Sequence, residues 1–150
     1  MTIHRLSNEE FNQINEKFRH VWDYQGAFWY PLDDCIRNDI IAFDFQYVQT
    51  RENLEFIKDL LKKHNVTILI QLREDGIAFK NDDLEDFNFW NKSDDYYWNN
   101  DCFWFDQSMD WVIYISHEQT ITFGGEWIIE TLKNNWIDWK ENISWDTKNK

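Results

Sequence analysis

Three runs of apolar and aromatic residues decide the fold of this chain: Cys102-Phe-Trp-Phe105, Trp111-Val-Ile-Tyr-Ile-Ser116 and Thr120-Ile-Thr-Phe123. Each run has the length of a strand and is rich in the β-branched and aromatic residues that strands favour. Two short polar breaks, Asp106–Asp110 and His117–Gln119, separate the runs. Connections this short join antiparallel neighbours, so we expect a three-stranded antiparallel meander.

Helical patterns stand on both sides of the meander. Gly124-Gly125 ends the last strand, and the apolar residues of Glu126–Trp136 then recur at helical spacing. Near the N-terminus, Ser7-Asn-Glu-Glu10 is a capping-box sequence, which predicts a helix over residues 8–22. Thr50 can cap another helix, which we expect to stop at Asn65.

The remaining strand signals lie between these helices. Val66–Leu72 and Ile77–Phe79 flank the turn sequence Glu74-Asp75-Gly76, which predicts a hairpin, and Ile40–Tyr47 is strand-like. Helices and strands that follow one another without regular β-α-β alternation indicate an α+β fold. We therefore expect a single α+β domain over residues 1–150, with an antiparallel sheet made of the meander and one hairpin and packed by about three helices.

Composition limits the partners of this chain. Its 150 residues include 28 aromatic residues, among them ten Trp, which is enough apolar surface for a folded core. They carry 28 carboxylates against 15 Lys and Arg, a net charge of −13. Binding to nucleic acid or to an anionic membrane needs clustered cations, so we expect neither. The field of the chain instead attracts basic partners.

The sequence also predicts a location. No apolar run approaches the roughly 20 residues that a membrane-spanning helix requires, and the first ten residues lack the apolar core of a signal peptide. Cys35 and Cys102 are far apart and belong to no metal-binding pattern, which indicates two buried free thiols in a reducing compartment. We expect a cytoplasmic protein.

One segment has the composition of a contact surface. Residues 81–110, here called the acidic-aromatic segment, contain nine carboxylates, one cation and nine aromatic residues. Rings supply contact area at low entropic cost, and carboxylates attract and pair with Lys or Arg. The same composition also suits a solvated loop whose rings enter the core. As partner-binding residues we predict the acids and rings in its first part: Asp82, Asp83, Glu85, Asp86, Trp90, Asp94, Asp95, Tyr96, Tyr97 and Trp98.

The sequence contains no complete motif for catalysis or metal binding. His117-Glu118 begins like the zinc motif HExxH, but Ile121 stands where its second His is required. Asp82–Asp86 resembles a calcium loop in charge alone, because it lacks the Gly of the sharp turn. The chain has no nucleophile elbow and no glycine-rich phosphate loop. We predict no catalytic residue, no metal and no cofactor.

These observations favour a small, acidic, non-enzymatic protein that binds a basic protein. In size, acidity and low cysteine content it is similar to bacterial immunity proteins that neutralise toxins, a likeness of composition without a shared motif. The alternative is a small-molecule or carbohydrate-binding protein, or a hydrolase, with an aromatic-lined acidic cleft at Trp104, Glu118 and Glu126. A third possibility is a subunit whose rings form a permanent interface.

Overall fold

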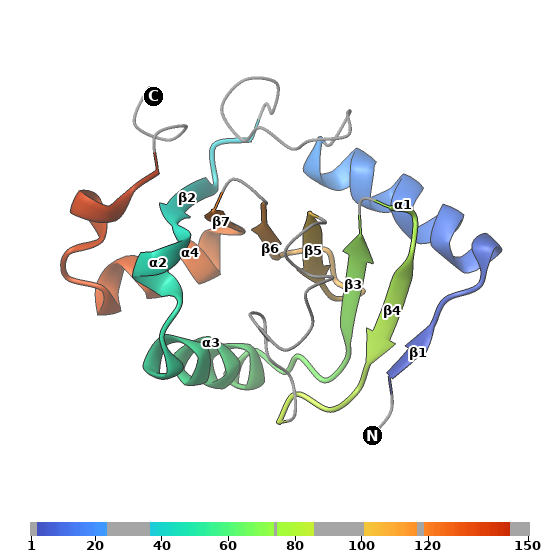
Figure 1. Cartoon of the computed structure of the whole chain (residues 1–150), viewed down its shortest axis with the longest axis horizontal. Helices are drawn as coiled ribbons and strands as arrows, with labels where there is room; N and C mark the ends of the chain where they lie inside the picture. The colour runs from blue at the N-terminus through green and yellow to red at the C-terminus, as the bar shows by residue number, and fades with distance from the viewer. Residues whose placement is uncertain (1–2, 24–36, 74, 86–100, 117–118, 145–150) are drawn as a thin grey trace.

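The computed structural model describes residues 3–23, 37–73, 75–85, 101–116 and 119–144 (Figure 1). The strands among these residues are β1 (Ile3–Arg5), β2 (Ile40–Asp44), β3 (Leu69–Arg73), β4 (Ala78–Asn81), β5 (Cys102–Phe105), β6 (Val112–Ile115) and β7 (Thr120–Gly124). The helices are α1 (Asn8–Trp22), α2 (Phe45–Val48), α3 (Arg51–Lys63), α4 (Glu126–Asn135) and the 3₁₀ helix η2 (Trp139–Asn142).

All seven strands belong to one antiparallel sheet with the order β1-β4-β3-β5-β6-β7-β2. The expected meander is β5-β6-β7, and the expected hairpin is β3-β4, whose turn uses Gly76 at a φ of +88°. β3 pairs with β5, so hairpin and meander form one continuous sheet. The α+β fold is confirmed.

Helices cover both faces of this sheet. α1 packs on one face through Phe18 and Trp22, while α3 and α4 pack on the other, and Figure 1 shows α1 and α3 on opposite sides of the strands. Successive residues of β5 therefore enter different cores. Phe103 contacts Phe18 edge-on at 4.8 Å between ring centroids, whereas the next residue, Trp104, is buried on the α3 face. Both faces of β5 are apolar because both are covered.

The capping signals set the helix starts as expected. Ser7 Oγ accepts a hydrogen bond from the Glu10 N–H at 3.2 Å, and a Glu10 carboxylate oxygen accepts from the Ser7 N–H at 3.0 Å. Thr50 Oγ1 accepts from the Asn53 N–H at 3.1 Å at the start of α3. The helix expected to reach Trp136 is also present and ends one residue earlier, at Asn135.

Two local expectations are corrected, and one strand was not expected. The strand expected over Ile40–Tyr47 ends at Asp44, because the chain turns into α2 and buries Phe45 and Val48. β3 begins at Leu69 rather than Val66, because the Val66 N–H still bonds to the Leu61 carbonyl at 3.0 Å and completes the exit from α3. β1 was not predicted, since its three residues are all exposed and carry no apolar pattern.

A glycine in β7 lets α1 reach the sheet. A Cβ atom on Gly124 would lie 2.7 Å from Trp22 Cζ3 and 2.8 Å from Val112 Cγ1, closer than real side chains approach. Trp22 is fully buried, and its ring occupies the space that a side chain at position 124 would need. The close contact between α1 and β7 therefore requires glycine here.

We predict that Gly124→Ala lowers the free energy of unfolding by about 1–3 kcal/mol, because the added methyl overpacks this contact. The measurement is urea unfolding of the wild type, Gly124→Ala, Trp22→Phe and the double variant. The smaller ring removes the clash with Trp22 but not the one with Val112, so the double variant should be less destabilised than the two single losses added together while staying less stable than the wild type. Simple additivity would show that the two residues do not compete for this space.

Candidate functional site

The structure describes the two ends of the acidic-aromatic segment, residues 81–85 and 101–110. At the first end the chain leaves β4 through two successive side-chain turns. Asn81 Oδ1 accepts from the Asp83 N–H at 2.8 Å, and Asp83 Oδ1 accepts from the Glu85 N–H at 3.1 Å. Between them, Leu84 enters the core on the α3 face. These turns fix the start of the segment with its own polar side chains.

Two lysines of α3 hold the same end. Lys58, only 6% exposed, donates to the Glu85 carbonyl at 3.0 Å, and Lys62 forms an ion pair with the Glu85 carboxylate. The hydrogen bond that Lys62 donates to the Glu85 carboxylate raises the pKa of Lys62. Of the predicted contact residues here, Glu85 is thus engaged within the chain. Asp82 is exposed and makes no hydrogen bond or ion pair in the described part of the chain.

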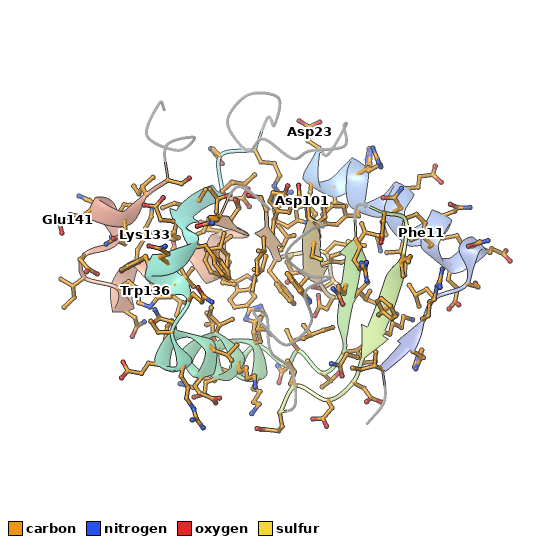
Figure 2. All side chains as sticks on the ribbon, in the orientation of Figure 1. Phe11, Asp23, Asp101, Lys133, Trp136 and Glu141 are labelled. Atoms are coloured by element: carbon orange, nitrogen blue, oxygen red, sulfur yellow. The ribbon has the colours of Figure 1, made fainter. Side chains whose placement is uncertain are left out.

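The second end is held by a buried carboxylate. Asp101, labelled in Figure 2, is 1% exposed and accepts a hydrogen bond from the Tyr114 hydroxyl at 2.5 Å. Farther along, Asp106 accepts from the Ser108 N–H at 3.1 Å, and Asp110 lies 3.9 Å from His64 Nε2. Several acids of the segment therefore serve its own structure.

The two ends lie at opposite ends of β3. In the sheet register Asn81 is opposite Leu69, whereas Cys102 is opposite Arg73. Residues 82–101 therefore connect two parallel strands, β4 and β5, across the length of β3, which is about 13 Å. The other seven predicted contact residues lie outside the described residues: Asp86, Trp90, Asp94, Asp95, Tyr96, Tyr97 and Trp98.

We expect Tyr114→Phe to lower the free energy of unfolding by about 1.5–3 kcal/mol, because it removes a hydrogen bond to a buried carboxylate. Tyr47→Phe is the matched control, since the Tyr47 hydroxyl donates to exposed Asp138 at 2.7 Å. It should lower the unfolding free energy by about 0.5 kcal/mol. Equal losses in urea unfolding would contradict a special role for the buried pair.

Of the three residues of the alternative cleft, the structure describes Trp104 and Glu126. Trp104 is buried on the α3 face, Glu118 lies outside the described residues, and Glu126 is exposed in the first turn of α4. Glu126 does line an open hollow of about 590 Å³, which Trp104 does not reach. The hollow lies between residues 37–39 and one stripe of α4, formed by Glu126, Ile129, Glu130 and Lys133.

Sequence reasoning missed the wall of this hollow opposite α4. Arg37 Nε and Nη2 donate to the two carboxylate oxygens of Asp39 at 2.8 and 2.6 Å, and Nη1 donates to the Val21 carbonyl at 3.0 Å. The guanidinium also stacks over the Trp22 ring, 3.9 Å from its centroid. The only sequence signal was an Arg and an Asp two positions apart before a strand. The Arg37 hydrogen bond lowers the pKa of Asp39 below its ordinary value of 3.8.

We predict that Asp39→Asn lowers the free energy of unfolding at neutral pH by about 1 kcal/mol, a value reduced by the water that reaches both side chains. Because the pKa of Asp39 is lower in the folded state, this stability is present above 3.8 and disappears as the pH falls. Urea unfolding of variant and wild type should thus differ at neutral pH and converge as the pH falls through the lowered pKa of Asp39. A difference that persists at the acid end would contradict the ion pair as its source.

Other chemistry in the described residues is limited. Cys102 is a free, buried cysteine, as expected, and burial raises its pKa to about 12. Cys35 lies outside the described residues. Among the described residues, no group of three or more His, Cys, Asp or Glu side chains could hold a metal ion. None of the described helices has the length and apolar character to span a bilayer.

We compared the chain with protein-family models, curated proteins and solved structures. None of the three comparisons found a match.

Proposed function

We propose that this chain is a cytoplasmic, non-enzymatic binding protein that holds a basic protein partner through its acidic-aromatic segment. The partner would be a basic toxin or enzyme, neutralised as immunity proteins neutralise toxins. A nuclease, for example, needs a cationic surface to hold the phosphates of its substrate. An acidic protein that covers this surface blocks access to the nucleic acid.

The observation that carries this proposal is the concentration of charge. Residues 81–110 have a net charge of −8, which leaves −5 for the other 120 residues. Screening limits the reach of such charges to about 8–10 Å in physiological salt, so a partner senses the local density more than the total. A dense acidic region accelerates the encounter with a cationic surface and orients the partner as it approaches.

The structure supports this proposal through the way both ends of the segment are held. Lys58 and Leu84 anchor the first end, and the Asp101–Tyr114 pair anchors the second. A segment closed at both ends has less conformational freedom to lose on binding than a free tail. The aromatic residues within it are of the kind that form the strongest contacts at protein interfaces.

The direct test is capture of the partner. The purified chain is the bait, lysate and the products of neighbouring genes are the prey, and retained proteins are identified by mass spectrometry after washes at low and high salt. The proposal predicts one basic protein, retained at low salt and weakened at high salt. A bait that retains nothing in either wash would contradict it.

We expect the variant D82N/D83N/D94N/D95N to associate with this partner roughly tenfold more slowly at low salt, with a weaker dependence on salt. The matched control, E9Q/E16Q/E52Q/E55Q, removes the same charge from exposed positions of α1 and α3. It should change the rate little, because these positions lie outside the segment. Stopped-flow mixing measures both rates, and an unchanged rate in the first variant would sink the proposal.

A further inference from the structure

The hollow beside α4 has the dimensions of a ligand site. The four helix residues that line it stand at positions i, i+3, i+4 and i+7, so they form one stripe about 10 Å long. Residues 37–39 form the opposite wall, and a backbone hydrogen bond of 2.9 Å from the Gly125 N–H to the Asp39 carbonyl joins the two walls. Its volume of about 590 Å³ lies within the range of small-molecule sites.

The wall at residues 37–39 is held by several contacts and is internally neutral. The guanidinium of Arg37 is held by the Asp39 carboxylate, by the Val21 carbonyl and by the Trp22 ring. Because Asp39 already binds Arg37 through both of its oxygens, its charge is compensated within the wall. This wall gives the hollow a fixed shape rather than a net charge.

The helix wall carries two carboxylates, Glu126 and Glu130, and one cation, Lys133. Glu126 and Glu130 are exposed, and neither forms an ion pair or side-chain hydrogen bond in the described part of the chain. The Lys133 ammonium instead lies 4.6 Å from the centroid of the Trp139 ring. Lys133 is labelled on the left of Figure 2. Between the two glutamates Ile129, 8% exposed, supplies an apolar surface.

We propose that this hollow binds an alkylguanidinium or alkylammonium group. The cationic head pairs with Glu126 and Glu130, and the aliphatic stem lies against Ile129. A guanidinium can donate parallel hydrogen bonds to a carboxylate, while an anion would meet two glutamates against the single positive charge of Lys133. The apolar surface favours a cation with a carbon stem over a bare metal ion. The group belongs either to a free small molecule or to an Arg or Lys side chain of a protein.

The test is a titration of the full chain with butylguanidinium, followed through the Ile129 methyl groups by NMR. The uncharged isostere butylurea is the parallel probe. We expect butylguanidinium to shift the Ile129 signals with a Kd on the order of 1 mM, a typical strength for so small a ligand. Butylurea should leave the signals unchanged. Equal shifts with both probes, or none with either, would overturn the proposal.

Variants locate the response. E126Q/E130Q should weaken butylguanidinium binding about fivefold, because it removes both negative charges of the helix wall. E52Q/E55Q is the matched control, since it removes two exposed glutamates from α3, one of them also in the first turn of its helix. The control should bind as the wild type does. Equal weakening in both variants would assign the effect to net charge and overturn the site.

A pull-down with the E126Q/E130Q variant as bait identifies the source of the cation. The butylguanidinium titration needs no partner, so its result does not depend on the proposed function. If the E126Q/E130Q bait captures less of the partner than the wild-type bait does, the hollow receives a side chain of that partner. If its capture is unchanged, or no partner exists, butylguanidinium binding assigns the hollow to a free small cation. Both results support the same site chemistry, which the titration alone can overturn.

Discussion

Burial of both faces of the central strands β3 and β5 is the constraint on which the rest of this structure depends. β3 and β5 have no exposed residue, so neither strand can place a charged side chain in solvent on either face. The charges of an acidic chain must then gather on helix surfaces, on the outer strands and in connections. The connection from β4 to β5 receives the densest group, because its two ends lie at opposite ends of β3 and a long segment must join them.

The same constraint explains the close packing of α1. A helix that covers an apolar face must come near the strands, and Gly124 allows the Trp22 ring to do so. Behind this ring, Arg37 stacks and bonds to the last turn of α1, so the contact between helix and sheet also orients one wall of the hollow. Packing in the core and the shape of a surface site are thus linked through one tryptophan.

Local signals predicted those parts of the fold that local interactions control. The Ser7–Glu10 capping box, the turn at Gly76 and the short polar breaks of the meander all act over a few residues, and each was evident in the sequence. β1 and α2 were missed for two reasons. β1 is an exposed edge strand that depends on its pairing with β4. α2 is too short for its apolar residues to show a helical period.

Of the candidate site, too, the sequence predicted the local features and missed the contacts between distant residues. Its charge density is a property of composition and was predictable, but the internal engagement of Glu85 and Asp101 was not, because their partners are 23 and 13 positions away. The hollow joins residues that stand almost 90 positions apart, with Arg37 on one wall and Glu126 on the other. Such a pairing follows only from the placement of β2 beside β7, which no local pattern in either strand specifies.

We propose the acidic-aromatic segment as the surface that meets a partner. The most direct measurement is deuterium uptake of the chain, peptide by peptide, alone and in complex with the captured basic protein. The account predicts protection concentrated in peptides from residues 81–110, with little change along the exposed face of α1. Protection confined to α1 or to other peptides, with unchanged uptake over residues 81–110, would contradict it.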